Sequence, residues 1–272
     1  MMKADTDDGV QIAYRTEGQG PCSLLLMHGW GGAGSGHSWS EVLKYLNPSG
    51  LRLISVDLRG YGRSGRPVSG FTLERFARDM AAVADHANVQ RFVAVGYSMS
   101  GRWAQWMSCQ MPDRVAAQIL IAPAPATALP LADELIERWI EDVQDPQRFE
   151  QFVGQFTKTR LASEIVDAYF RDASSASPQA LRESLNMCRT RDFSSYLEAA
   201  RVPTLVLGGS DDPLFSPQFL RDEVIGRIAR SRLVVLDCGH EIPLEKPVET
   251  AGLIEAFVAG LTSVELGAST AV

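Results

Sequence analysis

The chain has 272 residues, of which 45% are hydrophobic and 22% charged, and its formal net charge is −7. This length suits one large α/β domain with an insertion, or two small domains, and the composition is that of an ordinary globular protein. An acidic chain without a basic run has no electrostatic footprint for nucleic acid or for an anionic membrane surface, so neither is expected as a partner.

The beginning of the chain and its cysteines favour a reduced compartment. The first residues, MMKADTDDGVQIAYRTEG, lack the apolar core of a signal peptide, and no apolar run is long enough to span a bilayer. The four cysteines are scattered and form no C-x-x-C pair. We therefore expect a cytoplasmic protein without a structural metal.

Short apolar runs alternate with helical patterns through the first half of the chain. Strands are expected at Val10–Arg15, Cys22–Met27, Leu51–Val56, Arg91–Val95 and Val115–Ile121. The intervening helices are expected at about His37–Leu46, from the Thr72 cap to about Ala87, and over Arg102–Met111. This alternation is typical of a mostly parallel sheet with helices on both faces.

The alternation stops at Leu131–Ala200, which carries helical patterns but no strand. Helices are expected there at about Ala132–Val143, Gln147–Thr157, Ala162–Arg171 and Gln179–Cys188. Strands resume at Pro203–Gly208 and Arg232–Leu236, and a last helix is expected near Val248–Leu261. A helical block between two strands is typical of a lid over the carboxyl ends of the strands, where ligands bind. We therefore expect residues 1–126 and 201–272 to form one α/β core, and residues 127–200 to form a helical lid.

The stretch Arg91–Gly101, RFVAVGYSMSG, places one serine between a strand and a helix. Small residues two positions before and two after it would let the strand and the helix approach closely. This is the setting of a nucleophile elbow, G-x-S-x-G, although here a serine replaces the second glycine. The looser pattern G-x-S-x-S also occurs around Ser38, but after a glycine-rich loop and not after a strand. The sequence therefore predicts Ser98 as the nucleophile, the alternative being that Ser98 only caps the helix.

Serine chemistry also needs a base and an acid, and candidates for both follow later strands. His240 follows the last predicted strand, whereas the other three histidines lie before the glycine-rich loop or near helix ends. The acid is expected at Asp212, directly before Pro213, with Asp211 as the alternative. Such a carboxylate holds the imidazole in the required tautomer and stabilises the imidazolium.

A glycine-rich segment, His28–Gly32, follows another predicted strand. Glycines let the backbone pass close to a ligand. An oxyanion hole is therefore expected from the N–H groups of Trp30 and Met99, the second being the residue after the nucleophile. The segment does not match the dinucleotide pattern G-x-G-x-x-G, so no cofactor is expected.

Together these residues give the chain a resemblance to proteins of the α/β-hydrolase fold. The motifs that carry it are His28–Gly31, Asp57–Ser64, Gly96–Gly101, Gly209–Pro213 and Gly239–His240. The chain order Ser98, Asp212, His240 is that of the family. The resemblance implies an eight-stranded, mostly parallel sheet, a serine hydrolase triad and a lid in the position of the helical block. Asp57–Ser64 is expected to be structural support, and Ser100 departs from the family's usual glycine.

The predicted function is hydrolysis of a carboxylic ester or lactone of a small molecule, through an acyl-enzyme on Ser98. Carbon–carbon bond hydrolysis, haloperoxidase-like perhydrolysis and acyl transfer stay open with the same residues, because the fold hosts many chemistries. A ligand receptor with little turnover is the alternative from another class. The oligomeric state and the substrate-binding residues have no sequence signal. Six aromatic residues of the lid either form an apolar cover or pack within the lid; they are Trp139, Phe149, Phe152, Phe156, Tyr169 and Phe170.

Overall fold

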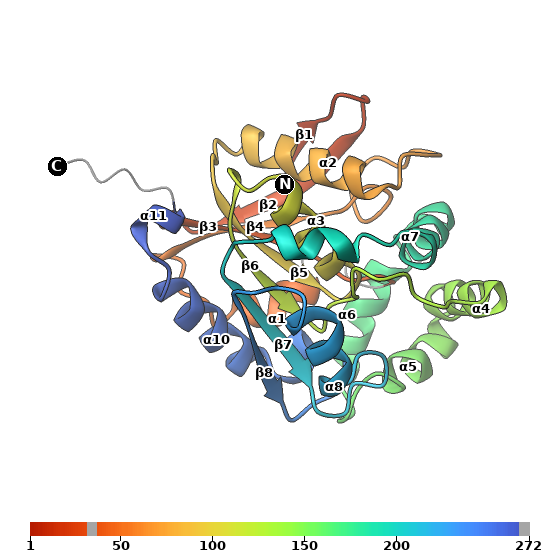
Figure 1. The fold of residues 1–272 in the computed structure, drawn as a ribbon. Coiled ribbons are helices and arrows are strands. Elements are labelled where there is room, and N and C mark those ends of the chain that lie inside the picture. The colour runs from red at the N-terminus through yellow and green to blue at the C-terminus, as the bar shows by residue number, and fades with distance from the viewer. Residues whose placement is uncertain (32–36, 267–272) are drawn as a thin grey trace.

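The computed structural model describes residues 1–31 and 37–266, and it contains one eight-stranded sheet (Figure 1). The strand order is β1-β2-β4-β3-β5-β6-β7-β8. The strands are β1 (Met2–Asp5), β2 (Gln11–Glu17), β3 (Cys22–Met27), β4 (Leu51–Val56), β5 (Phe92–Tyr97), β6 (Val115–Ile121), β7 (Thr204–Gly209) and β8 (Ser231–Leu236). The strands from β4 to β8 in this order pair in parallel, and β1 and β2 are antiparallel additions at one edge. The prediction of an eight-stranded, mostly parallel sheet is confirmed.

Helices cover both faces of the sheet. On one face α2 (Leu73–His86) contacts α3 (Met99–Gln110), and the ring of Trp103 stacks on Phe76 with centroids 4.1 Å apart. On the other face α1 (His37–Leu43) contacts α10 (Pro247–Ala259), in an apolar cluster that includes Trp39 and Ile254. Because both faces are covered, the central strands β3, β5, β6 and β7 are buried at every residue, which explains their continuous apolar runs.

Several short elements of the fold were not predicted from the sequence. Strand β1 buries only Ala4 among its four residues, so it lacks an apolar signal. The region between β7 and β8 contains α8 (Pro217–Leu220) and a π-helical turn, Arg221–Ile225, which are both too short for a clear period. The remaining short helices are α9 (Ile242–Glu245) and α11 (Ser263–Leu266).

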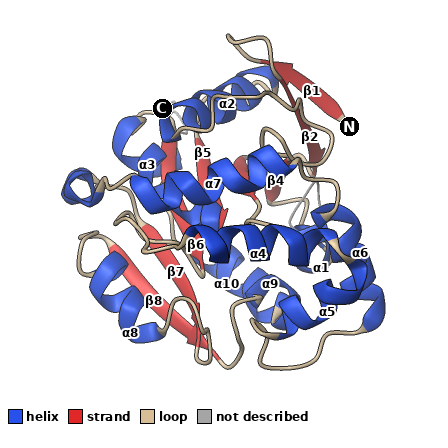
Figure 2. Cartoon of the chain, turned by 90° about the vertical axis from the view of Figure 1, so that its right-hand side faces the viewer, coloured by secondary structure: helices blue, strands red, loops and turns tan. Residues whose placement is uncertain are grey.

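Four helices and a 3₁₀ turn lie between β6 and β7 in sequence. They are α4 (Asp133–Gln144), α5 (Pro146–Gly154), α6 (Ser163–Ala173), α7 (Pro178–Thr190) and the turn Ser194–Ala199. All four predicted helices are present, with slightly different ends. Two begin at clear sequence signals, because Asp145 and Ser177 cap α5 and α7 and each is followed by a proline. Figures 1 and 2 show α4 to α7 gathered on one side of the molecule, although β6 and β7 are neighbours in the sheet.

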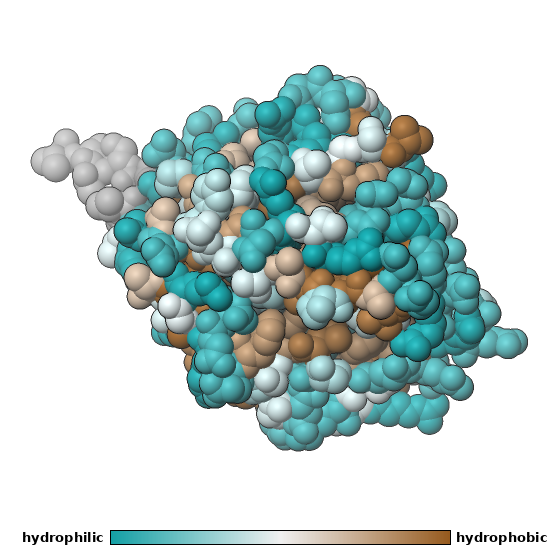
Figure 3. Space-filling view, turned by 45° about the vertical axis from the view of Figure 1, so that its right-hand side comes forward, coloured by the Kyte–Doolittle hydropathy of each residue, from teal (hydrophilic) through white to brown (hydrophobic). Residues whose placement is uncertain are grey.

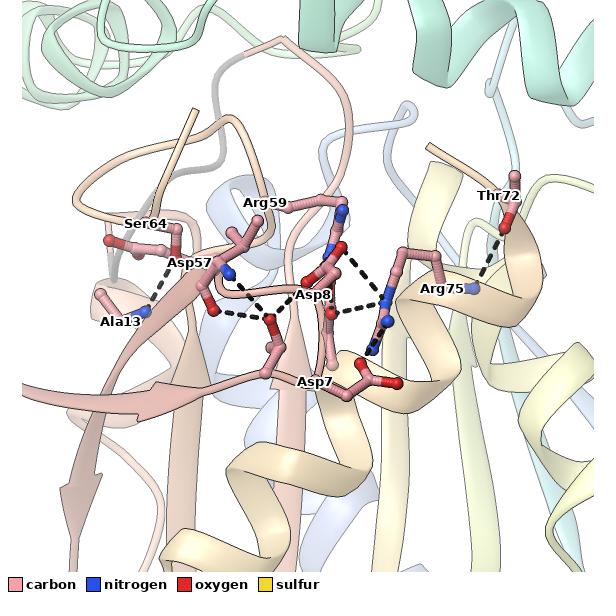
Figure 4. Close-up of polar contacts among 11 residues, drawn as sticks. Asp7, Asp8, Ala13, Asp57, Arg59, Ser64, Thr72 and Arg75 are labelled. Atoms are coloured by element: carbon pink, nitrogen blue, oxygen red, sulfur yellow. Dashed lines mark hydrogen bonds and ion pairs between the residues drawn. The ribbon is translucent and has the colours of Figure 1, made fainter. Parts of the chain in front are cut away.

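The motif Asp57–Ser64 ties β4 to its surroundings (Figure 4). The Ser64 hydroxyl donates to the Asp57 carbonyl at 2.5 Å and accepts from the Ala13 N–H at 2.8 Å, which joins the motif to β2. The buried Arg59 guanidinium pairs with Asp79 of α2 at 2.6 Å and with Asp8 of the β1–β2 turn at 3.1 Å. These contacts join a strand end, a hairpin and a helix.

Within the described ranges, no helix is long and apolar enough to cross a membrane.

Candidate active site

Ser98 lies on the sharp turn between β5 and α3, with φ 52° and ψ −116°. A Cβ at Gly96 would lie 2.4 Å from the Ser100 carbonyl oxygen, so a glycine is required there. Ser100 itself is buried, and its hydroxyl donates to the Met27 carbonyl at 2.7 Å and lies 2.9 Å from the Tyr97 N–H. The serine that replaces the usual glycine therefore fits, and it ties the turn to β3.

The structure brings the side chains of Ser98, His240 and Asp212 together. His240 Nε2 lies 2.8 Å from Ser98 Oγ, and His240 Nδ1 lies 2.8 Å from Asp212 Oδ2. The other carboxylate oxygen, Asp212 Oδ1, accepts from the N–H groups of Leu214 and Phe215 at 2.8 and 3.0 Å. Because a carboxylate only accepts, the imidazole carries its proton on Nδ1 and leaves Nε2 to accept the serine proton.

Asp211, the alternative acid, points elsewhere. Its carboxylate accepts from Lys158 Nζ at 2.9 Å and from the Ser210 hydroxyl, and half of its side chain is exposed. These two hydrogen bonds, with Ser210 the stronger cause, lower the pKa of Asp211. Of the two neighbouring aspartates, only Asp212 contacts the imidazole.

Burial and charge act in opposite directions on His240. Burial lowers the pKa of the imidazole. The charge of Asp212 and its hydrogen bond raise this pKa by more than burial lowers it, so the net shift is upward. The rings of Tyr97, Phe156 and Phe215 lie around the imidazole at centroid distances of 5.8, 6.4 and 5.6 Å. The charge of Asp212, with smaller effects of Glu241 and Glu245, thus stabilises the imidazolium form among these aromatic rings.

The glycine-rich segment passes directly beside the serine. A Cβ at Gly29 would lie 3.1 Å from the Tyr97 ring and 3.2 Å from the Ser98 Cβ, so a side chain here would require these neighbours to shift. Trp30 and Met99 both line the cavity beside Ser98. Met99 is the first residue of α3, where a backbone N–H has no acceptor within the helix. Residues 32–36, which continue the segment, lie outside the described residues, as does the side chain of Ser38.

His28 holds this segment in place. Its ring lies with Nδ1 2.8 Å from the Gly29 carbonyl and with Nε2 3.1 Å from the Leu58 N–H, so one nitrogen donates and the other accepts. Burial lowers the pKa of His28 to about 4, which keeps the ring neutral. His28 therefore links the ends of β3 and β4.

Ser98 and His240 open onto a cavity of about 200 Å³. Most of its lining is apolar, and in the space-filling view hydrophobic side chains gather near the middle of one face, with hydrophilic residues around them (Figure 3). Of the six aromatic residues that the sequence singled out between β6 and β7, four line the cavity: Trp139, Phe152, Phe156 and Tyr169. The other two, Phe149 and Phe170, pack against each other with centroids 5.3 Å apart.

Several lining residues had no signal in the sequence. They are Tyr97, Ala124, Leu129, Pro130, Leu131, Leu185, Cys188, Leu214, Phe215 and Glu241. Most are single apolar residues in loops, where no periodicity marks them. Glu241 directly follows His240, but the sequence predicted no role for its side chain. In the part of the chain that the structure describes, no group of three or more His, Cys, Asp or Glu side chains could hold a metal ion.

Comparison with known proteins agrees with this fold. The family model of the alpha/beta hydrolase fold matches residues 23–184, and the chain belongs to this family. A pimeloyl-[acyl-carrier protein] methyl ester esterase from Aromatoleum aromaticum is 30% identical over 87% of this chain and 98% of that protein. A putative non-heme chloroperoxidase from Synechocystis is 28% identical over 85% of this chain and 88% of that protein. Among solved structures, an esterase from Exiguobacterium antarcticum matches with a TM-score of 0.85 and 24% identity, over 95% of this chain and 99% of that one. The protein is thus a hydrolase of the α/β-hydrolase fold, as predicted.

Proposed function

We propose that this protein hydrolyses a carboxylic ester of a small molecule, with Ser98 as nucleophile, His240 as base and Asp212 as the orienting acid. The observation that carries the proposal is the hydrogen-bonded series from Ser98 through His240 to Asp212, at 2.8 Å for both contacts, opening onto an apolar cavity. An apolar cavity with a few polar groups at one end is typical of a small-molecule site.

The reaction follows from these contacts. His240 Nε2 takes the hydroxyl proton as Ser98 Oγ attacks the ester carbonyl, and the negative charge develops on the carbonyl oxygen beside the N–H groups of Trp30 and Met99. Collapse of this intermediate breaks the bond to the alcohol, which leaves with the proton from His240. The acyl group stays on Ser98. Water then attacks the acyl-enzyme with the help of His240, and the carboxylic acid is released.

We also propose that residues 127–200 act as a lid that selects the substrate. Four of its aromatic side chains, Trp139, Phe152, Phe156 and Tyr169, line the cavity, while the three reacting side chains come from outside it. The Trp30 indole N–H donates to the Leu181 carbonyl of α7 at 2.7 Å, so the segment also holds the side chain of an oxyanion residue.

A serine-directed phosphonate probe and a panel of esters and lactones test the proposal. The intact protein is expected to bind one probe molecule, and peptide mass mapping is expected to place it on Ser98. Steady turnover of a chromogenic ester should disappear in Ser98→Ala and persist in the matched control Ser38→Ala. An adduct on Ser38, or a single burst without turnover, would contradict the proposal, and the burst would favour a receptor. Faster turnover of lactones than of open-chain esters would move the assignment to a lactonase.

A further inference from the structure

The apolar cavity has one polar wall that the proposed reaction does not use. Glu241, Tyr97 and Tyr169 line the cavity and come from three separate parts of the fold: the loop after His240, the end of β5, and helix α6. All three side chains are buried, and Glu241 is only 5% exposed. Glu241 directly follows His240, and its carboxyl group hydrogen-bonds to the two tyrosines and not to the imidazole, although its charge raises the pKa of His240.

The hydrogen bonds show what kind of group this wall offers. The Tyr97 hydroxyl donates to Glu241 Oε2 at 2.7 Å, and the Tyr169 hydroxyl lies 3.1 Å from both carboxyl oxygens. Burial, and then the charge of Glu241, hold the pKa of each tyrosine well above its usual range, so both hydroxyls stay protonated as donors. Burial raises the pKa of Glu241, and the charge of His240 and the two tyrosine hydrogen bonds oppose this shift. In its ionised form the carboxylate can accept about four hydrogen bonds, so it retains acceptor capacity beyond the two tyrosines.

With His240 neutral, as the proposed base must be, no positive side chain among the described lining residues balances this carboxylate. Among the described residues that line it there is no lysine or arginine, and Glu241 is the only acid. The buried cation Arg102 of α3 does not line the cavity, and its guanidinium donates to the carbonyls of Pro125 and Thr127. A second negative charge brought into this apolar space would meet Glu241 at low dielectric, where repulsion between like charges is strong.

We infer that Glu241 determines substrate specificity: the substrate presents a hydrogen-bond donor, a hydroxyl or an ammonium group, to Glu241, and substrates with a carboxylate in that position are rejected. This inference rests on the proposed ester hydrolysis and names the class of ester. Tyr97 and Tyr169 hold the carboxyl group in place, and Tyr169 also fixes this part of α6 to the loop that carries His240.

Matched esters of medium-chain acids that end in a methyl, hydroxyl, ammonium or carboxylate group test the inference, and a second series carries the same groups on the alcohol part. In the intact protein, kcat/KM for the hydroxyl or ammonium ester should exceed that for the carboxylate ester by at least roughly tenfold in one series. A tenfold ratio corresponds to about 1.4 kcal/mol, the size of one charge-assisted contact. In Glu241→Gln, which keeps the shape and removes the charge, this ratio should fall by roughly tenfold.

The exposed Glu249→Gln, in the first turn of α10, is the matched control, because it makes the same change in net charge at a side chain that does not line the cavity. Its ratio should equal that of the unaltered protein. Equal rates for the carboxylate and ammonium esters in the unaltered protein, or an unchanged ratio in Glu241→Gln, would overturn the inference. The methyl-ended ester distinguishes a failure of the proposed ester hydrolysis from a failure of the inference on Glu241. If neither this ester nor the others are hydrolysed, the proposed function itself is wrong. If Glu241→Gln does not fold, as judged by its thermal melt, the ratio in the unaltered protein still decides.

Discussion

At the scale of single residues, the position of Asp212 is the most strongly determined feature of the site. One carboxylate oxygen is held by two backbone N–H groups, and this leaves the other aimed at His240 Nδ1. The acid is therefore oriented before any substrate binds. Its neighbour Asp211 shares the same turn, but it faces Lys158 and solvent.

This difference predicts unequal effects of the same substitution. Asp212→Asn keeps the shape but favours the wrong imidazole tautomer, so turnover should fall by up to about 10⁴-fold, the loss seen in a serine protease. Asp211→Asn is the matched control and should change turnover by less than about threefold, since an exposed ion pair contributes little. The measurement is kcat on one chromogenic ester, and the reverse ranking would mean that the wrong carboxylate was assigned.

The pH profile gives a second readout of the same pair. The base must be neutral to accept the serine proton, and Asp212 raises the pKa of His240 against the opposing effect of burial. Activity should therefore be lost as the pH falls through a midpoint above the ordinary value of about 6.5. In Asp212→Asn the residual activity should have a lower midpoint, because the largest of the charges that oppose burial is then removed.

At the scale of elements, the loop that carries His240 is bonded to the segment between α5 and α6. The His240 N–H donates to the Phe156 carbonyl at 2.6 Å, and Glu245 accepts from the N–H groups of Gly239 and Lys158, both at 2.8 Å. A Cβ at Gly239 would lie 2.4 Å from the Phe156 carbonyl oxygen, so the two loops touch. The base and the cavity lining are thus built as one unit.

The ion pairs of Arg59 with Asp79 and Asp8 lead to a prediction about stability, which concerns no residue of the cavity lining. Both partners of the Arg59–Asp79 pair are fully buried, so Asp79→Ala would leave a buried guanidinium with only the partly exposed Asp8. We expect the free energy of unfolding to fall by about 3 kcal/mol. Asp7→Ala, which removes a largely exposed partner of Arg75, is the control and should cost no more than about 0.5 kcal/mol. Urea unfolding measures the free energy of unfolding of both variants. Equal losses would show that the buried Arg59–Asp79 pair contributes no more to stability than the exposed contact.

The elements differed in how readily the sequence predicted them, for physical reasons. Buried strands such as β3 and β5 have uninterrupted apolar runs, because helices cover both of their faces. Strand β1 has no such pattern at the sheet edge, and α8 is too short for one. Ser98, Asp212 and His240 could be predicted because each follows a strand within a recognisable motif. Glu241 and the scattered lining residues could not, because tertiary contacts alone bring them together.

At the scale of the whole molecule, the segment between β6 and β7 supplies much of the cavity wall and none of the three hydrogen-bonded side chains of the proposed triad. Shortening Phe152 to alanine should enlarge the cavity and shift preference toward longer acyl chains by roughly 10- to 200-fold, the range that hydrophobic contacts achieve. Phe170→Ala, in the same segment but outside the cavity lining, should leave this preference within about threefold. Turnover of an acetate ester should change little in either variant.

The measurement is kcat/KM across acyl lengths, with thermal melts to identify unfolded variants. Suppose that a stably folded Phe152→Ala loses activity on acetate as completely as Ser98→Ala does. The segment would then contribute to the reacting groups themselves, and its assignment as a selective cover would be wrong.

Because β6 and β7 are hydrogen-bonded neighbours, the chain leaves the sheet and re-enters it at adjacent positions. In evolutionary terms, the segment between them can lengthen, shorten or be exchanged by recombination without changing the register of any strand. The contacts of this segment with the core constrain such changes, among them those of Phe156 with the His240 loop, of Leu181 with Trp30 and of Tyr169 with Glu241. Descendants of one ancestral gene can therefore acquire new substrates while they inherit the same bond-breaking groups.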